Sequence, residues 1–393
     1  MTKLLDLKNN SVIAINQNNY TKEDNYKKVC YLDTDNITNN RINAFLKIDL
    51  TKEKLPSRAK RKCSLNSIIC SSVRPNQRHF GIIKEIPKNF LVSTAFIVID
   101  IIDLEKLDPN YLYYYITQDK ITHYLQRIAE CRTSSYPSIT PLDFLNIKIK
   151  LYPLETQQKI ARTLSILDQK IENNHKINEL LHKILELLYE QYFVRFDFLD
   201  ENNKPYQTSG GKMKFSKELN RLIPNDFEVK TLGELTQLKV GNKNANHSSN
   251  QGKYPFFTCS NNPLRCETYQ FEGKHIIISG NGNFYVTHYD GKFGAYQRTY
   301  VVNPNNPNHY VLIYLFVKSY TNYLKLQSRS SIIKFITKSD IENIKIVLPN
   351  LKTYSKWNNV LKMIENNNQS TQTLTVLRDF LLPLLLKQQV KPK

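Results

Sequence analysis

The most regular hydrophobic pattern in the chain lies near its middle, between Pro153 and Arg195. No glycine or proline interrupts this stretch after Pro153. Apolar residues recur there in alternating steps of four and three, with two asparagines inside the series: Ile160, Leu164, Leu167, Ile171, Asn174, Asn178, Leu181, Leu185, Leu188 and Tyr192. This heptad pattern predicts a long helix that pairs with another helix. The alternative is a long helix packed on one domain.

The residues before this helix form short apolar or β-branched runs separated by turn residues, at 11–15, 68–73, 80–83 and 90–102. Such runs predict strands. Asp108 followed by Pro109 predicts the start of a helix over 110–129, because an aspartate cap and an early proline both favour helix initiation. A helical turn from Thr140 and a strand over 147–151 should follow. A β-rich domain therefore precedes the long helix.

The residues after the helix show the same order of elements. Residues 197–225 are polar, contain Gly210 and Gly211, and are expected to form a linker. Strand-like runs recur at 254–259, 275–279, 284–288 and 299–302. We expect a helix over 310–326, a helical turn over 339–342, a strand over 344–348 and a final helix over 351–387, with Pro383 in its last turns.

An internal repeat relates the two halves. The series Ile139, Thr140, Asp143, Asn146, Ile147, Lys148 and Ile149 recurs 197 residues later as Ile336, Thr337, Asp340, Asn343, Ile344, Lys345 and Ile346. At the same spacing Arg132 and Ser134 match Arg329 and Ser331, and Asn173-Asn174 match Asn366-Asn367 at a spacing of 193. A repeat of this length indicates a duplicated domain and not a solenoid period.

The heptad pattern returns in the final helix, at Trp357, Val360, Ile364, Asn367, Thr371, Leu374, Arg378, Leu381 and Leu385. We therefore predict that the two helices pair as an antiparallel coiled coil, with Asn174 and Asn367 setting the register. The residues predicted to form this pair are Ile160, Leu164, Leu167, Ile171, Asn174, Leu181, Leu185, Leu188, Val360, Ile364, Asn367, Leu374 and Leu381.

The predicted fold class is α+β, with two β-rich domains that are each followed by a long helix and related by pseudo-twofold symmetry. Such symmetry suits duplex DNA, which has an approximate twofold axis of its own. The predicted boundaries are 1–152 for the first domain, 153–196 for the central helix, 197–225 for the linker, 226–349 for the second domain and 350–393 for the distal helix.

The charge balance favours a polyanionic partner. Lys and Arg number 55 against 35 Asp and Glu, giving a formal net charge of +20. Such an excess is typical of proteins that bind DNA or RNA. The alternative is an AT-rich genome, which raises Lys, Asn, Ile and Tyr together, and Asn, Ile and Tyr are abundant here.

Several classes of function are disfavoured by what the sequence lacks. The six cysteines form no Cys-x-x-Cys pair, so no metal site is expected and the thiols should be reduced, as in the cytoplasm. The N-terminus has no signal peptide and no apolar run is long enough to span a membrane. A phosphate-binding Gly-x-x-x-x-Gly-Lys loop is absent. Asp108-Pro109-Asn110-Tyr111 approaches a methyltransferase motif, but its counterpart at 307–310 also precedes a helix, so no catalytic residue is assigned.

These features resemble the specificity (S) subunits of type I restriction-modification enzymes over nearly the whole chain. The most specific stretch is Pro153-Leu154-Glu155-x-Gln157-Gln158-Lys159-Ile160-Ala161, then Leu167-Asp168-x-Lys170-Ile171, ending in Tyr192-Phe193-Val194-Arg195-Phe196-Asp197. Residues 228–235 resemble the start of a second target recognition domain. The first domain lacks the tryptophan that usually begins such a domain, which makes its N-terminus atypical.

The resemblance implies a division of labour. Two target recognition domains would each read half of a bipartite double-stranded DNA target, while the helices space them and dock two methyltransferase subunits. Restriction subunits would join to cut DNA. The S subunit would bind no cofactor itself; S-adenosylmethionine, ATP and Mg would belong to the partner subunits.

Candidate DNA contacts are residues whose side chains bind phosphates or base edges. In the first domain they are the cations of a basic segment: Arg58, Lys60, Arg61, Lys62, Arg74 and Arg78. In the second domain they lie around a Gly-Asn-Gly-Asn turn and after it: Asn281, Asn283, Tyr285, Lys292, Gln297 and Arg298. The alternative for each is an ordinary solvated surface residue.

Overall fold

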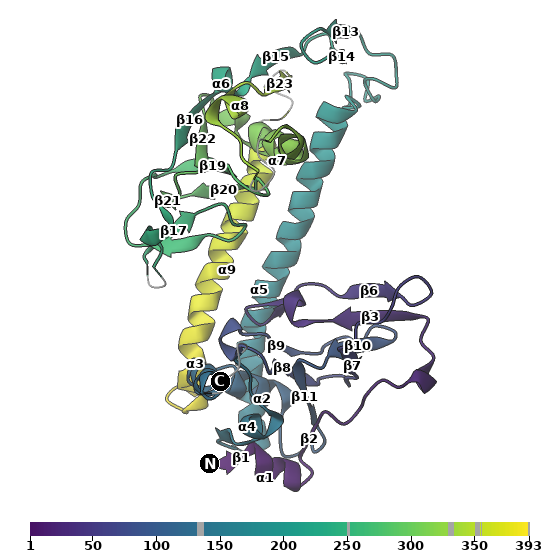
Figure 1. The fold of residues 1–393 in the computed structure, drawn as a ribbon, viewed down its shortest axis with the longest axis vertical. Helices are drawn as coiled ribbons and strands as arrows, with labels where there is room; N and C mark the ends of the chain where they lie inside the picture. Colours follow the sequence, from purple (N-terminus) through teal and green to yellow (C-terminus); the bar gives the residue numbers. More distant parts are fainter. Residues whose placement is uncertain (132–136, 250–251, 329–333, 350–353, 355, 392–393) are drawn as a thin grey trace. The chain divides into compact units, whose positions relative to one another are not determined.

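The computed structural model describes residues 1–131, 137–249, 252–328, 334–349, 354 and 356–391. They form two compact units, the first built from residues 1–173 and 371–393 and the second from residues 174–370. Both long helices, α5 (Leu154–Tyr189) and α9 (Trp357–Leu386), contribute to both units (Figure 1). The predicted domain boundaries differ from this division, because they treat each helix as a separate segment.

The first unit is built on two four-stranded sheets, with orders β2-β11-β8-β9 and β6-β3-β10-β7. The strands are β2 (Ile13–Ile15), β3 (Lys28–Leu32), β6 (Leu46–Asp49), β7 (Ala59–Arg61), β8 (Ile68–Ser71), β9 (Phe80–Ile82), β10 (Phe90–Ser93) and β11 (Phe96–Ile101). Two short pairs accompany them, β4 (Ile37–Thr38) with β5 (Arg41–Ile42), and β1 (Thr2–Lys3) with β12 (Lys148–Ile149). Its helices, besides parts of α5 and α9, are α1 (Leu4–Asn9), α2 (Pro109–Ile116), α3 (Asp119–Glu130) and α4 (Pro141–Leu145).

The second unit contains a four-stranded sheet of order β16-β22-β19-β20 and a three-stranded sheet of order β18-β17-β21. The strands are β16 (Thr236–Val240), β17 (Tyr254–Phe257), β18 (Leu264–Cys266), β19 (Lys274–Ser279), β20 (Val286–Asp290), β21 (Gly294–Ala295) and β22 (Thr299–Pro304). Two pairs complete it, β13 (Met213–Ser216) with β14 (Arg221–Pro224), and β15 (Glu228–Thr231) with β23 (Lys345–Leu348). Its shorter helices are α6 (Leu232–Leu235), α7 (Tyr310–Gln327) and α8 (Lys338–Glu342).

The duplication predicted from the sequence is visible in the connectivity. The sheet order β2-β11-β8-β9 is repeated in chain order by β16-β22-β19-β20. In the first copy β1, which precedes α1, pairs antiparallel with β12, which follows α4. In the second copy β15, which precedes α6, pairs antiparallel with β23, which follows α8. The helical turns α4 and α8 carry the same cap, because Thr140 and Asp143 share their hydrogen bonds just as Thr337 and Asp340 do. The repeat residues Arg132, Ser134, Arg329 and Ser331 lie outside the described residues.

Each unit buries one large apolar core that includes turns of the long helices. In the first unit Ile160 and Leu164 of α5 and Leu385 of α9 join the buried tyrosines of α2. In the second unit Leu185 of α5 and Leu361 of α9 join α7 and the four-stranded sheet. The long helices are therefore core elements of each unit as well as partners of one another.

Within each unit α5 and α9 run side by side in opposite directions (Figure 1). In the second unit Asn178 is 7% exposed, accepts a hydrogen bond from Asn367 Nδ2 at 3.0 Å and donates to Asn368 Oδ1 at 2.8 Å. Asn367 therefore forms a hydrogen bond with Asn178. The sequence predicted that Asn174, one helical turn earlier on α5, would set the register together with Asn367. All thirteen residues predicted for the helix pair are buried or half-buried.

Two predicted elements are divided in the structure. The expected helix over 110–129 is α2 and α3, because Gln118 has an extended backbone and its side chain donates to the carbonyl of Tyr115 at the end of α2. The expected strand over 90–102 is β10 and β11, which belong to different sheets. The final helix, expected over 351–387, corresponds to α9, which starts at Trp357. Residues 351–353 lie outside the described residues.

The segment 197–225, predicted to be a linker, is a folded part of the second unit. Phe198 stacks on Tyr206 with ring centroids 4.8 Å apart and on Phe227 at 5.5 Å. The β13–β14 hairpin follows, and a side chain at Gly211 would collide with Tyr206 at 2.5 Å. The linker prediction was wrong because these aromatic residues are far apart in a polar sequence and meet only after folding.

Candidate nucleic-acid interface

The second unit gathers most of its candidate residues at one end of its four-stranded sheet. Strand β19 is antiparallel to both β20 and β22, so the end of β19 lies beside the starts of the other two. The β19–β20 turn carries Asn281, Asn283 and Tyr285, and Gln297 and Arg298 directly precede β22. We call residues 280–285 together with 297–298 the second hairpin end.

Backbone contacts give this turn its shape. Gly280 N donates to Arg298 O at 2.7 Å, and a side chain at Gly280 would meet that oxygen at 2.6 Å. Gly282 has φ +74°, which favours glycine. Asn283 Nδ2 donates to the hydroxyl of Tyr285 at 3.1 Å. Asn283, Tyr285, Gln297 and Arg298 are exposed, so their side chains are accessible to a ligand.

Lys292 lies apart from the other five candidates. It follows β20, whose last residue Asp290 pairs with Lys274 at the start of β19, at the opposite end of the sheet. Its ammonium lies 3.8 Å from Glu272 Oε1 and 4.8 Å from the ring centre of Tyr269. These contacts make Lys292 part of a local surface cluster.

The first unit has an equivalent hairpin end, formed by the β8–β9 turn at residues 72–79. Arg74 and Arg78 lie in this turn, on either side of the short 3-10 helix Pro75–Gln77. Both have left-handed backbones, with φ of 45° and 56°. Arginine rarely adopts this conformation, which costs about 1–2 kcal/mol for an ordinary residue. The turn therefore places two arginines where glycine or asparagine would be less strained.

Hydrogen bonds show that the two turns occupy the same structural position. Ser72 O accepts from Ile139 N and Gly280 O accepts from Ile336 N. One further pair repeats as well, since Arg74 N donates to Pro137 O and Gly282 N donates to Lys334 O. Arg74 and Gly282 are therefore equivalent backbone positions with different side chains. Alignment of the sequences alone does not reveal this, because the turns differ in length and composition.

The remaining cations of the basic segment are spread over the first unit. Thr94 N donates to Arg58 O, and Ser72 N donates to Ala95 O, so the exposed Arg58 lies close to the first hairpin end. Lys60 is exposed on the edge strand β7. Arg78 forms an ion pair with Asp119 of α3 and lines a cavity of about 310 Å³.

Two members of the segment are engaged within the protein. Burial lowers the pKa of Arg61, whose Nε is buried without a hydrogen bond to any described residue. Lys62 Nζ lies 2.6 Å from Asp24 Oδ1, and that hydrogen bond raises the pKa of Lys62. The most accessible cations of the segment are Arg58, Lys60 and Arg74.

Sequence reasoning missed one cation at the second hairpin end. Lys334 contributes its carbonyl oxygen to the turn, and its exposed ammonium donates to Lys325 O at 3.2 Å. The repeat relates Lys334 to Pro137, 197 residues earlier, but only the hydrogen bonds of the structure show that both residues contact the turns.

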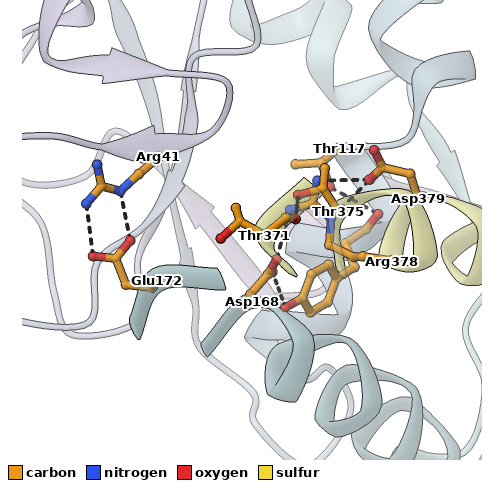
Figure 2. Close-up of polar contacts among 9 residues, drawn as sticks. Arg41, Thr117, Asp168, Glu172, Thr371, Thr375, Arg378 and Asp379 are labelled. Carbon is orange, nitrogen blue, oxygen red and sulfur yellow. Dashed lines mark hydrogen bonds and ion pairs between the residues drawn. The ribbon is translucent and has the colours of Figure 1, made fainter. Parts of the chain in front are cut away.

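A separate polar cluster joins α5, α9 and α2 inside the first unit (Figure 2). Asp168 Oδ1 accepts a hydrogen bond from Arg378 Nη1 at 2.9 Å, and Oδ2 accepts from the Tyr114 hydroxyl at 2.6 Å. Burial raises the pKa of Tyr114, and the negative charge of Asp168 adds to the shift. Arg41 Nε of β5 lies 2.8 Å from Glu172 Oε2 of α5, and Figure 2 draws this ion pair.

The described residues hold no cluster of histidine, cysteine and carboxylate side chains suited to a metal ion. Among those same residues, no helix has the length and apolarity to cross a membrane. The chain is thus a duplicated scaffold: two β-rich domains with equivalent hairpin ends of different chemistry, each packed on two long helices.

Comparison with known sequences assigns this scaffold to a protein family. The model of the type I restriction modification DNA specificity domain matches residues 6–183 and 224–376, and the chain belongs to this family. The type I restriction enzyme EcoDI specificity subunit of Escherichia coli is 37% identical over 132 residues, and the HindI specificity subunit of Haemophilus influenzae is 32% identical over 173 residues. These matches cover 32% and 44% of this chain, but only 28% and 37% of the two relatives.

A solved structure shows the same fold over the full length. The S subunit of the type I restriction-modification system from M. genitalium aligns with 98% of this chain and 99% of its own, with a TM-score of 0.54 and 18% sequence identity. The α+β fold with duplicated domains and long helices is therefore shared with an S subunit, as the sequence predicted.

Proposed function

We propose that this chain is the sequence-specific DNA-binding subunit of a type I restriction-modification complex, and that each unit reads one half of a bipartite target. The observation that carries this proposal is the pair of equivalent hairpin ends with different side chains. Arg74 and Arg78 stand in one, and Asn281, Asn283 and Tyr285 stand in the other. Different side chains on turns at equivalent positions are what reading two unlike half-sites requires.

The chemistry of the two ends suits base and phosphate recognition. Arginine can bind the O6 and N7 acceptors of guanine, and asparagine can bind the N6 and N7 of adenine. Lysines and arginines around these turns, with the net charge of +20, supply the electrostatic attraction to phosphates. Arg58, Lys60, Arg298 and Lys334 are proposed as phosphate contacts.

The long helices are proposed to dock the partner subunits. In the second unit α5 exposes an apolar stripe at helical spacing: Ile177, Leu180, Ile184 and Leu187, which are 44%, 62%, 46% and 50% exposed. A stripe of this kind on a helix surface is typical of a protein interface. We assign this stripe to the binding of methyltransferase subunits, and restriction subunits would join the assembly. In this proposal the partner subunits hold S-adenosylmethionine, ATP and Mg, and this chain performs no catalysis.

Co-expression with the methyltransferase subunit encoded beside this chain tests the proposal, with modified bases mapped across the host genome. We expect methylation at one asymmetric motif made of two short half-sites and a fixed spacer. A complex that assembles and methylates no bipartite motif would refute it.

The alternative functions predict other results. A specificity chain of another methylation-based system would direct methylation only with a partner that carries its own nuclease. A coiled-coil adaptor would assemble with partners but show no salt-dependent binding to DNA.

A further inference from the structure

The polar cluster of the first unit has an apolar counterpart in the second. The helices are repeats of each other at a spacing of 193 residues, which matches Asp168 with Leu361 and Arg378 with Leu185. Tyr114 of α2 follows an Asp-Pro helix start, and the matching Asn-Pro start at Asn306 places Leu312 at the same position. A carboxylate, a guanidinium and a phenol in one copy are therefore three leucines in the other.

Both versions of this layer are internally satisfied. The leucines are each 0% exposed and belong to the same apolar core cluster. In the first unit the Asp168 carboxylate receives both Arg378 and Tyr114, and their contacts are charge-assisted hydrogen bonds. Arg378 also contacts Asp379 Oδ1 at 2.9 Å, which uses a second edge of its guanidinium.

The arrangement is asymmetric between the helices: α5 carries the acid and a leucine, and α9 carries the base and a leucine. Because the helices are repeats, an α5 could also pair antiparallel with the α5 of a second chain in the equivalent register. Asp168 would then face Leu185 of that second copy. Likewise, Arg378 would face Leu361 when two α9 helices met. Like-with-like pairing would therefore separate the two charges in a half-buried layer, leaving Asp168 with the Tyr114 hydroxyl and Arg378 with the neighbouring Asp379.

We propose that the Asp168–Arg378 pair selects the helix partner: it makes α5 complementary to α9 and not to another α5. The pair is suited to this role because its side chains are only 27% and 31% exposed, so separating them costs stability, whereas the intact pair adds little beyond an apolar layer. The pair acts through the difference in stability between α5–α9 pairing and pairing of two identical helices. In coiled coils one buried polar residue can likewise determine the partner and the register. This inference is independent of whether the protein binds DNA.

Moving the arginine from α9 to α5 tests the proposal in the full chain. The double substitution Leu185→Arg with Arg378→Leu keeps the amino-acid composition unchanged. It lets two α5 helices form the acid–base layer with each other, and two α9 helices form an apolar layer. We expect a shift from the wild-type mass to twice that mass in light scattering after size exclusion. The control Asp168→Leu with Arg378→Leu has apolar layers throughout and should keep the wild-type mass.

A folded exchange variant that keeps the wild-type mass and the thermal stability of the control would overturn the proposal. A second experiment covers the case in which the exchange variant does not fold. Full-length chains carrying Asp168→Arg and Arg378→Asp singly, with different affinity tags, are co-expressed. Their charges are complementary only between chains, so we expect the tags to co-purify at least tenfold more than in a wild-type pair. Equal co-purification in the two pairs would also overturn the proposal.

Discussion

At the scale of single residues, Gln157 shows how a motif residue can be structural. Its side chain is 0% exposed and makes three hydrogen bonds near the start of α5. Oε1 accepts from Asp108 N at 3.0 Å, and Nε2 donates to Lys106 O at 2.9 Å and Tyr152 O at 2.8 Å. Gln157 thereby holds the N-terminus of α2 against the N-terminus of α5, which explains a glutamine at a fully buried position.

Replacing this residue should be costly. Gln157→Leu keeps a similar volume but leaves three backbone groups without their partner, so we expect a loss of about 3 kcal/mol in the free energy of unfolding. Denaturant titration followed by circular dichroism measures this. The neighbouring Gln158 is exposed, and Gln158→Leu should change stability by less than about 0.5 kcal/mol. Equal effects of the two substitutions would contradict the assigned role.

The burial of His288 in β20 predicts that the second unit loses stability in acid. Burial lowers the pKa of His288 from 6.5 to about 3, and nearby positive charges contribute. Glu365 lies 3.6 Å from its Nδ1, but this carboxylate is held by Lys274 at 2.9 Å. The charged or titratable groups around His288 are His182, Lys274, Tyr314, Lys318 and Glu365.

The sign of the pH dependence follows from the lowered pKa. The unfolded chain takes up this proton near pH 6.5 and the folded chain only near pH 3. Stability from His288 is therefore complete above pH 6.5 and falls by up to about 1.4 kcal/mol per pH unit below it. Replacing the imidazole, His288→Phe, should flatten the decline in melting temperature between pH 6.5 and 4.5. His123 is exposed, and His123→Gln should leave the decline unchanged.

Arg74 allows recognition to be separated from folding. Its left-handed backbone suits glycine, so Arg74→Gly should not strain the turn, and the free energy of unfolding of the variant is measured beside its affinity. If Arg74 contacts DNA, the affinity of the assembled complex for its target should fall about tenfold or more. Fluorescence anisotropy at several salt concentrations measures this. Arg162 is exposed on α5, and Arg162→Ala is the control for loss of one positive charge. Unchanged affinity in Arg74→Gly would remove this residue from the interface.

At the scale of elements, two polar contacts between α5 and α9 are separated by the same number of residues on each helix. Asp168 and Asn178 are ten residues apart on α5, and their partners Arg378 and Asn368 are ten residues apart on α9. Inserting four residues after Ile171 makes these distances unequal, so we expect the assembled complex to lose methylation or to change its motif spacer.

A compensating insertion makes this prediction sharper. Four further residues after Gln372 of α9 restore equal distances, and four residues add about 6 Å of helix. Methylation should return with a spacer longer by about two base pairs, given about 3.4 Å per base pair. Modified-base sequencing measures both the activity and the spacer. The control is a four-residue insertion at the exposed turn 201–204, which should leave the motif unchanged. An unaltered spacer in the doubly lengthened protein would show that the helices do not set it.

At the scale of the whole molecule, duplication is the organising feature. Each unit has its own core, its own hairpin end and a segment of both long helices. The sequence-specific part of each unit should therefore be exchangeable. Replacing residues 228–348 by the corresponding domain of another family member should change one half of the methylated motif and keep the other. A change in both halves would contradict independent reading by the two units.

The sequence by itself determined the duplication, the two long helices and the family. These are periodic or repeated features, and the free energy of burying an apolar stripe ties such patterns directly to local structure. The Thr140 and Thr337 caps could also be predicted, since each involves residues only three positions apart. Three candidate contacts of the second domain, Asn281, Asn283 and Tyr285, share one turn because they are close in the sequence, and their contact with DNA stays a prediction.

Only the tertiary structure decided which distant residues meet. The aromatic stack of Phe198, Tyr206 and Phe227 turned an expected linker into a folded segment, and Asn367 was found to donate a hydrogen bond to Asn178. The equivalence of Arg74 with Gly282 and the replacement of an ion pair by leucines became visible only through long-range contacts. Sequence patterns report local periodicity, whereas these contacts depend on how separated segments pack, which no local pattern encodes.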